Sequence, residues 1–174
     1  GWNPVEYEAL NEDFSTRGRR LSEQIEVLRA LWCNELIDYS GAHHQISDAG
    51  INPLPVQRPI HIWGGAFRPV AIERVCRLMD GFFPRMPLDD KTEGRMERIW
   101  AYLQDFGRSP ESFGIDATVY CKGNDVDQWV RDAERWKSLG ATHISIQTTA
   151  QGYGSWQQHI CLLYTSPSPR DTSS

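Results

Sequence analysis

The stretch Arg58-Pro-Ile-His-Ile-Trp-Gly-Gly-Ala66, together with the segment that ends in Met79-Asp-Gly-Phe-Phe83, decides the fold of this chain. Residues 60–63 form a short apolar run, typical of a strand buried on both faces, and two glycines end it. Pro69 suits the first position of a helix, because its missing N–H would have no helical partner there. Apolar residues then recur at helical spacing until Asp80-Gly81 breaks the pattern. The stretch predicts a strand, a glycine turn, a helix and a second strand.

The glycine turn is the first candidate binding feature. Because Gly64 and Gly65 carry no side chain, their backbone can approach a phosphate or a flat ring closely. A Gly-Gly pair alone is a weak indication of a ligand, so its interpretation depends on the rest of the chain. Trp63, Phe82 and Phe83 are interpreted as core residues rather than as a platform for a stacked ring.

The rest of the chain alternates between helical and extended patterns. Apolar stripes at helical spacing predict three more helices, around residues 21–32, 96–106 and 129–136. Alternating residues predict two more strands and a small hairpin, at residues 115–121, 142–148 and 37–46. Asn124 or Asp125 is expected to cap the third of these helices, and Gly140 to close it. The proline-rich residues 52–59 are expected to form an extended connector.

Strands separated by single helices require a parallel sheet with right-handed crossovers, and two architectures satisfy this order. One is a doubly wound sheet, but no GxGxxG motif follows any expected strand, so its dinucleotide-binding version is unsupported. The other is the (β/α)8 TIM barrel, which takes about 250 residues and of which four strands are half. We therefore predict an α/β fold that is part of a TIM barrel.

The composition is that of an ordinary globular protein: 174 residues, 40% of them hydrophobic, with a formal net charge of -5. The mild acidity argues against a nucleic-acid partner, and no apolar run approaches the roughly 20 residues that span a bilayer. The cysteines form no CxxC pair and the histidines lack ligand spacing, so we expect no metal site. The cysteines are interpreted as buried small hydrophobes in a reducing compartment, which predicts a cytoplasmic location.

The two ends do not resemble natural protein ends. The tail Cys161-Leu-Leu-Tyr-Thr-Ser-Pro-Ser-Pro-Arg-Asp171 matches, codon by codon, the translation of a transposase adapter used in shotgun sequencing libraries. Residues 161–174 are therefore interpreted as a non-native tail rather than as a natural Ser/Pro-rich disordered segment, and residues 1–160 as the domain. Gly1-Trp-Asn-Pro4 lacks an initiator Met and is expected to be a loop that follows a strand. We expect an open reading frame that is cut on both sides.

Residues 1–160 resemble the luciferase-like flavin and deazaflavin oxidoreductases. Residues 1–10 look like the family's loop after its fourth barrel strand, and Leu28-Arg-Ala-Leu-Trp32 looks like part of the helix that follows. Residues 51–59 resemble the insertion before strand five, and residues 60–83 resemble strand five with its helix. Residues 140–146 resemble the approach to strand eight. The order and spacing of the blocks favour the subgroup that depends on the deazaflavin coenzyme F-420.

The resemblance implies the second half of a TIM barrel, roughly strands five to eight, with the helix and hairpin insertion before strand five. It also implies that reduced FMN or coenzyme F-420 binds at the carboxyl ends of the strands, where barrel enzymes build their sites. The cofactor ring would supply the redox chemistry, and the protein would supply orientation, dryness and charge. The expected partner is a small organic substrate, and a homodimer is an expected assembly of the full-length protein.

Residue by residue, the resemblance assigns Gly64, Gly65 and Ala66 to the turn after strand five, which holds the cofactor. Gly1 and Trp2 match the end of strand four, which lines the same pocket. Some deazaflavin dehydrogenases carry a catalytic carboxylate where this chain has Trp2. This departure argues against an acid–base role at that position and against a sugar-phosphate dehydrogenase activity.

Arg19 resembles a luciferase arginine that meets the flavin phosphate, and Arg17 and Arg20 are close rivals for that role. Each of the three also fits a solvated helix face. Glu6 and Tyr7 match the family motif, although a carboxylate near a helix N-terminus can simply offset unpaired N–H groups. No catalytic side chain is assigned.

The leading hypothesis is an oxidoreductase in which a reduced flavin or deazaflavin exchanges hydride equivalents with a small organic substrate, with oxygen as co-substrate if the cofactor is FMN. Residues 147–149, at the end of the last strand, are candidates to face that substrate. The alternatives are a non-catalytic flavin-binding relative, an inert fragment, and a barrel isomerase or aldolase, for which Lys122 is the one suitably placed lysine. With half a barrel and two open sheet edges, the fragment itself is expected to aggregate and to be inactive.

Overall fold

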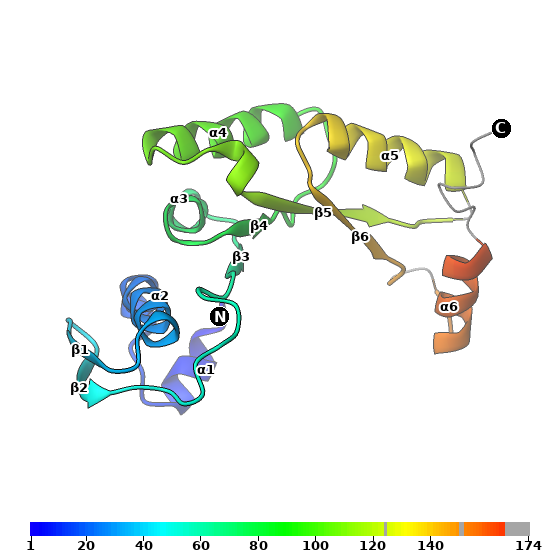
Figure 1. Ribbon diagram of the computed structural model, residues 1–174. Helices are drawn as coiled ribbons and strands as arrows, with labels where there is room; N and C mark the ends of the chain where they lie inside the picture. The colour runs from blue at the N-terminus through cyan, green and yellow to red at the C-terminus, as the bar shows by residue number, and fades with distance from the viewer. Residues whose placement is uncertain (124, 150–151, 166–174) are drawn as a thin grey trace.

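The computed structural model of this chain describes residues 1–123, 125–149 and 152–165 (Figure 1). Its helices are α1 (Pro4–Ala9), α2 (Arg17–Cys33), α3 (Pro69–Leu78), α4 (Thr92–Asp105), α5 (Val126–Ser138) and α6 (Trp156–Thr165). Its strands are β1 (Ile37–Ser40), β2 (Gln45–Ala49), β3 (Trp63–Gly65), β4 (Gly81–Phe83), β5 (Gly114–Tyr120) and β6 (His143–Gln147). Two short 3-10 turns, η1 (Phe14–Thr16) and η2 (Pro110–Ser112), precede α2 and β5.

Strands β3 to β6 form one parallel sheet in the order β3-β4-β5-β6, and one α-helix lies between each strand and the next. Trp63 pairs with Gly81 and Gly81 with Gly114, and further along β5 Asp116 pairs with His143. α4 and α5 lie along one side of this sheet (Figure 1). The predicted parallel sheet is confirmed; over the described residues it stays open, with β3 and β6 at its edges.

The first parallel strand differs from its prediction. The prediction placed it at residues 60–63 and ended it at Gly64-Gly65, whereas β3 spans Trp63–Gly65 and both glycines pair with β4. The Ile62 carbonyl does accept the Asp80 N–H at 2.7 Å, but the Ile62 N–H donates to the Asp80 side chain, at 2.8 Å, instead of to a strand carbonyl, so the paired strand starts at Trp63. Ile60, expected to be buried on both faces, keeps 38% of its surface exposed. The glycines thus belong to the sheet, and the turn begins at Ala66.

The core lies between the sheet and its helices. Alternate residues of β5 point to this side, and Ile115, Ala117 and Val119 are between 0% and 3% exposed. Leu103 of α4 and Trp136 of α5 belong to the same buried cluster. Burying such side chains contributes roughly 1.5–3 kcal/mol each, so this layer is a major source of stability. The strand predicted from the alternation at residues 115–121, and its buried face, are confirmed.

On the opposite face of the sheet, Trp63 lies across the first residues of the next two strands. A Cβ added to Gly81 would come within 2.3 Å of the indole, and one added to Gly114 within 2.1 Å. His143 meets the indole edge-on, with ring centroids 5.1 Å apart, and the Phe83 ring lies 5.5 Å away. Trp63 is therefore a packing residue, and the two glycines make room for it. The prediction that Trp63, Phe82 and Phe83 belong to the core holds for Phe82, which is 1% exposed, but it was wrong for half-buried Trp63 and for Phe83, which is 37% exposed, because both side chains lie outside the buried cluster.

The segments before β3 form a cluster that packs beside α3 (Figure 1). α2 buries Ile25 and Val27, and the predicted hairpin is confirmed by the antiparallel pairing of β1 with β2. Arg29 of α2 ties this cluster to the sheet domain, because its Nη2 donates to the Leu78 carbonyl at 3.0 Å and to Asp80 Oδ2 at 2.8 Å. The N-terminal cluster and the α3 layer therefore form one packed unit.

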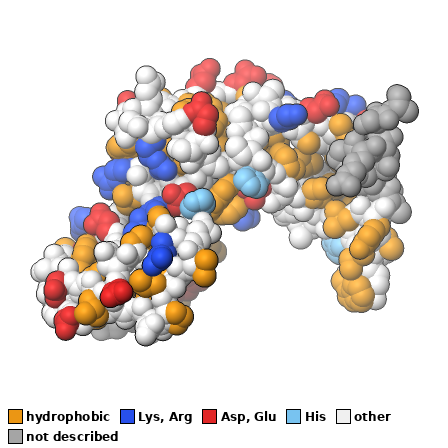
Figure 2. Space-filling view, viewed as in Figure 1, with side chains coloured by type: hydrophobic (Ala, Val, Ile, Leu, Met, Phe, Trp, Pro, Cys, Tyr) orange, Lys and Arg blue, Asp and Glu red, His pale blue; other side chains and the backbone are white. Residues whose placement is uncertain are grey.

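Two helices were not predicted. Residues 1–4 were expected to be a loop, yet α1 begins at Pro4, and the Asn3 side chain caps it by accepting a hydrogen bond from the Val5 N–H at 3.2 Å. α1 buries none of its residues, so it leaves no apolar periodicity in the sequence. α6 crosses the predicted boundary at residue 161, and hydrophobic side chains gather over it in Figure 2, with Trp156 67% exposed.

Candidate functional site

A cleft of about 1210 Å³ opens between the N-terminal cluster and the corner that joins β3 to α3. Its lining comes from α1 with the residue at the chain start, η1 and the first half of α2, the tip of the β1–β2 hairpin, and the β3–α3 corner. Gly65 is the last residue of β3, and Arg68 immediately precedes α3. The cleft thus lies at the carboxyl end of β3, the edge strand of the parallel sheet, and α/β folds bind their ligands at the carboxyl ends of such strands.

Arginine side chains dominate the charge of this cleft. Two acidic residues, Glu6 and Glu12, line it, and Glu12 forms an ion pair with Arg20. Arg74 is held by Ser22, whose hydroxyl accepts a hydrogen bond from Arg74 Nε at 3.1 Å. The arginines that line the cleft are four: Arg17, Arg20, Arg68 and Arg74. With four cations against two carboxylates, the lining carries a net positive charge that suits an anionic ligand.

Two of these arginines are fixed by their surroundings. The Arg17 guanidinium lies 3.6 Å from the centroid of the Phe14 ring, and its Nη1 donates to the Phe14 carbonyl at 2.7 Å. Arg74 packs so closely on α2 that a Cβ at Gly18 would lie 2.5 Å from its Nη2. Burial, and then the positive charges of Arg77 and Arg17, lower the pKa of the Arg74 guanidinium. A cation that is desolvated and repelled in this way is stabilised by a bound anion.

The N-terminus of α3 faces the same cleft. α3 has ten residues and begins with Pro69, and its N-cap residue Arg68 is extended. Within the described chain, the Arg68 side chain makes no capping hydrogen bond. Val70 and Ala71, in the first turn, line the cleft. The partial positive charge of a helix N-terminus therefore adds to that of the arginines.

The two glycines of β3 have different surroundings. A Cβ at Gly64 would lie 2.4 Å from Met79 Sδ and 2.8 Å from Val75 Cγ2, so this position is filled by α3. A Cβ at Gly65 would have its nearest neighbours at 3.9 Å, and Gly65 lines the cleft. Because successive residues of a strand face opposite sides, one glycine allows the helix to pack and the other leaves backbone open to the cleft.

The remaining residues assigned to the cofactor are divided between the cleft and other surfaces. Gly1 lines the cleft with Gly65, so the structure brings these two together. Trp2 is 86% exposed and Arg19 is also exposed, and both lie outside the lining, whereas the rivals Arg17 and Arg20 are within it. Ala66 lines a different cavity, between α3 and α4.

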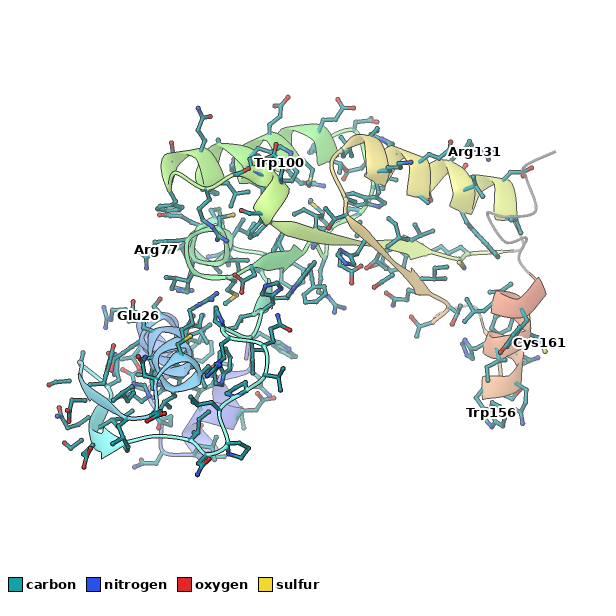
Figure 3. The ribbon with its side chains drawn as sticks, in the orientation of Figure 1. Glu26, Arg77, Trp100, Arg131, Trp156 and Cys161 are labelled. Atoms are coloured by element: carbon teal, nitrogen blue, oxygen red, sulfur yellow. The ribbon has the colours of Figure 1, made fainter. Side chains whose placement is uncertain are left out.

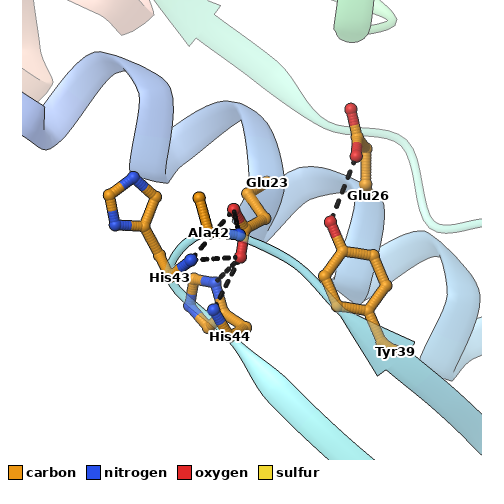
Figure 4. A network of polar contacts seen from close by, with 6 residues as sticks. All are labelled: Glu23, Glu26, Tyr39, Ala42, His43 and His44. Atoms are coloured by element: carbon orange, nitrogen blue, oxygen red, sulfur yellow. Dashed lines mark hydrogen bonds and ion pairs between the residues drawn. The ribbon is translucent and has the colours of Figure 1, made fainter.

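Sequence reasoning missed the role of Glu23, which fastens the hairpin to α2. Its carboxylate accepts hydrogen bonds from the backbone N–H groups of Ala42, His43 and His44 at 3.0, 2.9 and 2.6 Å, and lies 2.9 Å from His44 Nδ1 (Figure 4). Burial opposes the ionisation of Glu23, but these hydrogen bonds outweigh it and lower the pKa of the carboxyl. His43 and His44 line the cleft, so Glu23 positions one of its walls. The sequence feature that could have indicated this contact is Gly41 at the hairpin tip, where a Cβ would clash with the Glu23 carboxylate.

Residues 147–149, which were candidates to face the substrate, lie outside the cleft lining. The Gln147 side chain donates to the Thr149 hydroxyl, and the Thr148 hydroxyl lies 2.8 Å from His159 Nδ1 of α6. Over the described ranges, no three His, Cys, Asp or Glu side chains gather in a way that could hold a metal. In the same part of the chain, no helix combines the length and apolar character needed to cross a bilayer.

Parallel βα units with a basic, glycine-lined cleft at the carboxyl edge of the sheet define a class of α/β ligand-binding proteins. Within that class, residues 1–159 match the luciferase-like monooxygenase family, and the chain belongs to it. The resemblance drawn from the sequence blocks is thereby confirmed.

Curated relatives include enzymes named for each of the two cofactors. The F420-dependent glucose-6-phosphate dehydrogenase of Microbacterium testaceum (strain StLB037) is 34% identical over 149 residues, which cover 78% of this chain and 43% of that protein. The FMNH(2)-dependent dimethylsulfone monooxygenase of Pseudomonas putida is 29% identical over 131 residues, which cover 73% of this chain and 36% of that protein. The chain thus spans about two-fifths of the length of these relatives. They support an oxidoreductase family in general.

Solved structures share the fold at low identity. An F420-dependent secondary alcohol dehydrogenase in complex with an F420-acetone adduct has a TM-score of 0.64 and 11% identity, over 76% of this chain and 56% of that one. The monooxygenase RslO1 from Streptomyces bottropensis has a TM-score of 0.57 and 19% identity, over 80% of this chain and 44% of that one. The four-stranded parallel sheet is therefore similar to part of the fold of luciferase-like TIM-barrel proteins.

Proposed function

We propose that the cleft binds the phosphate-bearing arm of reduced FMN or coenzyme F-420, and that the whole protein is a luciferase-like oxidoreductase or monooxygenase acting on a small organic substrate. One observation carries the proposal: arginines, the N-terminus of α3 and the open backbone of Gly65 converge on a single cleft. Relatives named for each cofactor support the class of reaction and leave the choice of cofactor to experiment.

The lining residues fit a phosphate. Glu12 already pairs with Arg20, so Arg17, Arg68 and Arg74 are the cations best placed to gain from an anion. Guanidinium groups offer forked donors that match phosphate oxygens. The nearest atoms to a Cβ at Gly65 would be 3.9 Å away, which leaves space for a ligand to approach the backbone. Gly65, rather than Gly64, is therefore the glycine proposed to contact the cofactor.

When bound, the flavin or deazaflavin ring supplies the hydride chemistry, and the residues of this chain bind, orient and shield it. Anchoring the phosphate at the β3–α3 corner fixes where the ring can lie relative to the sheet edge. Gly1 belongs to this proposal as a further cofactor contact because it lines the cleft with Gly65, whereas Trp2, Arg19 and Ala66 lie outside that lining and are not proposed as contacts of the phosphate-bearing arm. The indole of Trp2 is only a hydrogen-bond donor, so an acid–base step is not assigned to that position.

The same proposal places the chain within a barrel. β3 to β6 would be strands five to eight of a TIM barrel, and α1, α2 and the hairpin would be the segment before strand five. The order of these elements and the likeness to barrel structures support this placement. Residues 1–160 would be the family domain and residues 161–174 a non-native tail, which agrees with a family match that ends at residue 159.

Equilibrium titration of the full-length protein with FMN and with F-420 separately tests the proposal, with riboflavin and the phosphate-free deazaflavin chromophore as matched ligands. Arg74→Gln and Arg68→Gln are expected to weaken FMN or F-420 binding about tenfold each, because a charged hydrogen bond contributes about 1.5 kcal/mol or more. The phosphate-free ligands should keep their affinity in both variants. Arg131→Gln, on α5 far from the cleft, is the control (Figure 3).

The result separates the candidate functions. Tight binding without turnover of any substrate by the reduced cofactor would favour the non-catalytic flavin-binding relative. Binding that responds equally to all three arginine replacements, or equal affinity for the phosphate-bearing and phosphate-free ligands, would show that the cleft is not the phosphate site.

A further inference from the structure

A second cavity, of about 350 Å³, lies between α3 and α4 on the other side of the β3–α3 corner. Within the described residues, it shares no lining residue with the cleft. The corner itself separates the two: Gly65, Arg68 and Val70 line the cleft, whereas Ala66 and Pro69 line the cavity. The two hollows are neighbours with different walls, since Arg85 of the cavity comes within 3.9 Å of a Cβ placed at Gly65.

The walls of this cavity are largely apolar. Phe82 of β4 and Ile99 of α4 line it and are 1% and 2% exposed, and Ile72 of α3 and Met86 of the loop after β4 also line it. A cavity of this size with an apolar lining and a few polar groups is typical of small-molecule sites. The apolar surface would accept a short hydrocarbon or aromatic group.

The polar residues of the cavity are cationic. Arg95 is neutralised by Asp89, whose Oδ1 lies 2.9 Å from its Nη1. Arg85 and Arg98 are exposed, and among the described residues neither forms an ion pair or a side-chain hydrogen bond. No carboxylate lines the cavity within that part of the chain. The cavity therefore combines apolar walls with two cations that lack a counter-charge.

We propose that this cavity binds a small amphiphilic carboxylate, such as a medium-chain fatty acid. The apolar tail lies between α3 and α4 against Ile72 and Ile99, and the carboxylate pairs with Arg85 and Arg98. Burial of the tail gives most of the affinity, because it removes apolar surface from water. The arginines select the anion over a neutral molecule of the same shape. The proposal rests on lining residues other than those of the proposed cofactor cleft.

Calorimetric titration of the full-length protein with octanoate and with octan-1-ol tests this inference. The double variant Arg85→Gln/Arg98→Gln should weaken octanoate binding about tenfold or more, since it removes both charged partners, and should leave octan-1-ol affinity unchanged. Arg77→Gln is the matched control, because Arg77 is an α3 arginine outside the cavity lining (Figure 3). Both arginines of the double variant are exposed, so the fold should be retained.

The position of the ligand is read from the isoleucine methyl groups by NMR. Octanoate should shift the δ1-methyl signals of Ile72 and Ile99 and leave that of Ile144, on β6, unchanged. Absence of binding at millimolar octanoate, equal loss of octanoate and octan-1-ol affinity in the double variant, or shifts confined to Ile144 would each overturn the proposal.

Discussion

Replacing Gly114 by alanine probes the packing that fills the open face of the sheet. A Cβ at this position would lie 2.1 Å from Cη2 and 2.3 Å from Cζ2 of Trp63, whereas carbon atoms in contact are normally about 3.5–4.0 Å apart. The indole must therefore move, and it would lose its edge-on contact with His143, whose ring centroid is 5.1 Å away. The backbone itself tolerates alanine, because Gly114 is not among the glycines with positive φ.

The expected cost follows from two opposing terms. Overpacking of this kind costs about 1–3 kcal/mol, and replacing glycine by alanine returns about 0.4–1 kcal/mol by restricting the unfolded chain. Gly114→Ala should therefore lower the free energy of unfolding by about 1–2 kcal/mol. Gly94→Ala is the matched control, since Gly94 lies within α4 with no atom within 4 Å of its added Cβ. That change should raise stability by a fraction of a kcal/mol.

Urea unfolding of a double-mutant cycle with Trp63→Leu isolates the contact. The smaller side chain removes the clash, so Gly114→Ala should cost about 1 kcal/mol less in the Trp63→Leu background than in the wild type. If the two substitutions prove additive, or if Gly114→Ala is as harmless as Gly94→Ala, the indole does not cover β5 as described.

Three further outcomes are expected. Glu23→Gln should speed hydrogen exchange at the His43 and His44 amides, and unchanged exchange would contradict the role of Glu23. Hydrogen bonding outweighs burial and lowers the folded-state pKa of Glu23 below its usual 4.5. The contribution of the Glu23 carboxylate to stability is therefore present above pH 4.5 and is lost as the pH falls through the lowered pKa. Burial raises the pKa of the Cys76 thiol to about 11, so iodoacetamide should label exposed Cys33 long before Cys76 in the folded chain, and equal labelling would disprove the burial. Ile115→Ala, at a fully buried position, should lower the free energy of unfolding by about 2–5 kcal/mol in urea titrations, and a loss below 1 kcal/mol would contradict the described core.

Most helices and strands could be predicted because their apolar periodicity records which face is buried. The stripe at residues 96–106 corresponds to α4, and the alternation at residues 115–121 to β5. The predicted cap Asp125 does accept the Gln128 N–H, at 3.0 Å. The other predicted cap, Asn124, lies outside the described residues. The prediction that all four cysteines are buried was wrong in part, since Cys33 and Cys161 are exposed.

The cleft could be predicted only in outline. The sequence pointed to a glycine corner and to arginines at the start of a helix, but it could not rank Arg17, Arg19 and Arg20. They lie within four residues on one helix, and which of them faces the corner depends on how α2 packs against α3. For the same reason, the sequence could not tell that α3 covers Gly64 and leaves Gly65 open.

Local patterns in the chain were sufficient to predict the βα order and, from that order, the parallel sheet, because each pattern reflects interactions between residues a few positions apart. The redox family was indicated by the resemblance of sequence blocks to known members. Long-range packing set the composition of the cleft, the fastening of the hairpin by Glu23 and the separate cavity between α3 and α4. These features join residues that are distant along the chain, such as Glu23 with His44 and Ala66 with Arg98. No local pattern encodes such proximity, which arises only when the helices settle against the sheet and against one another.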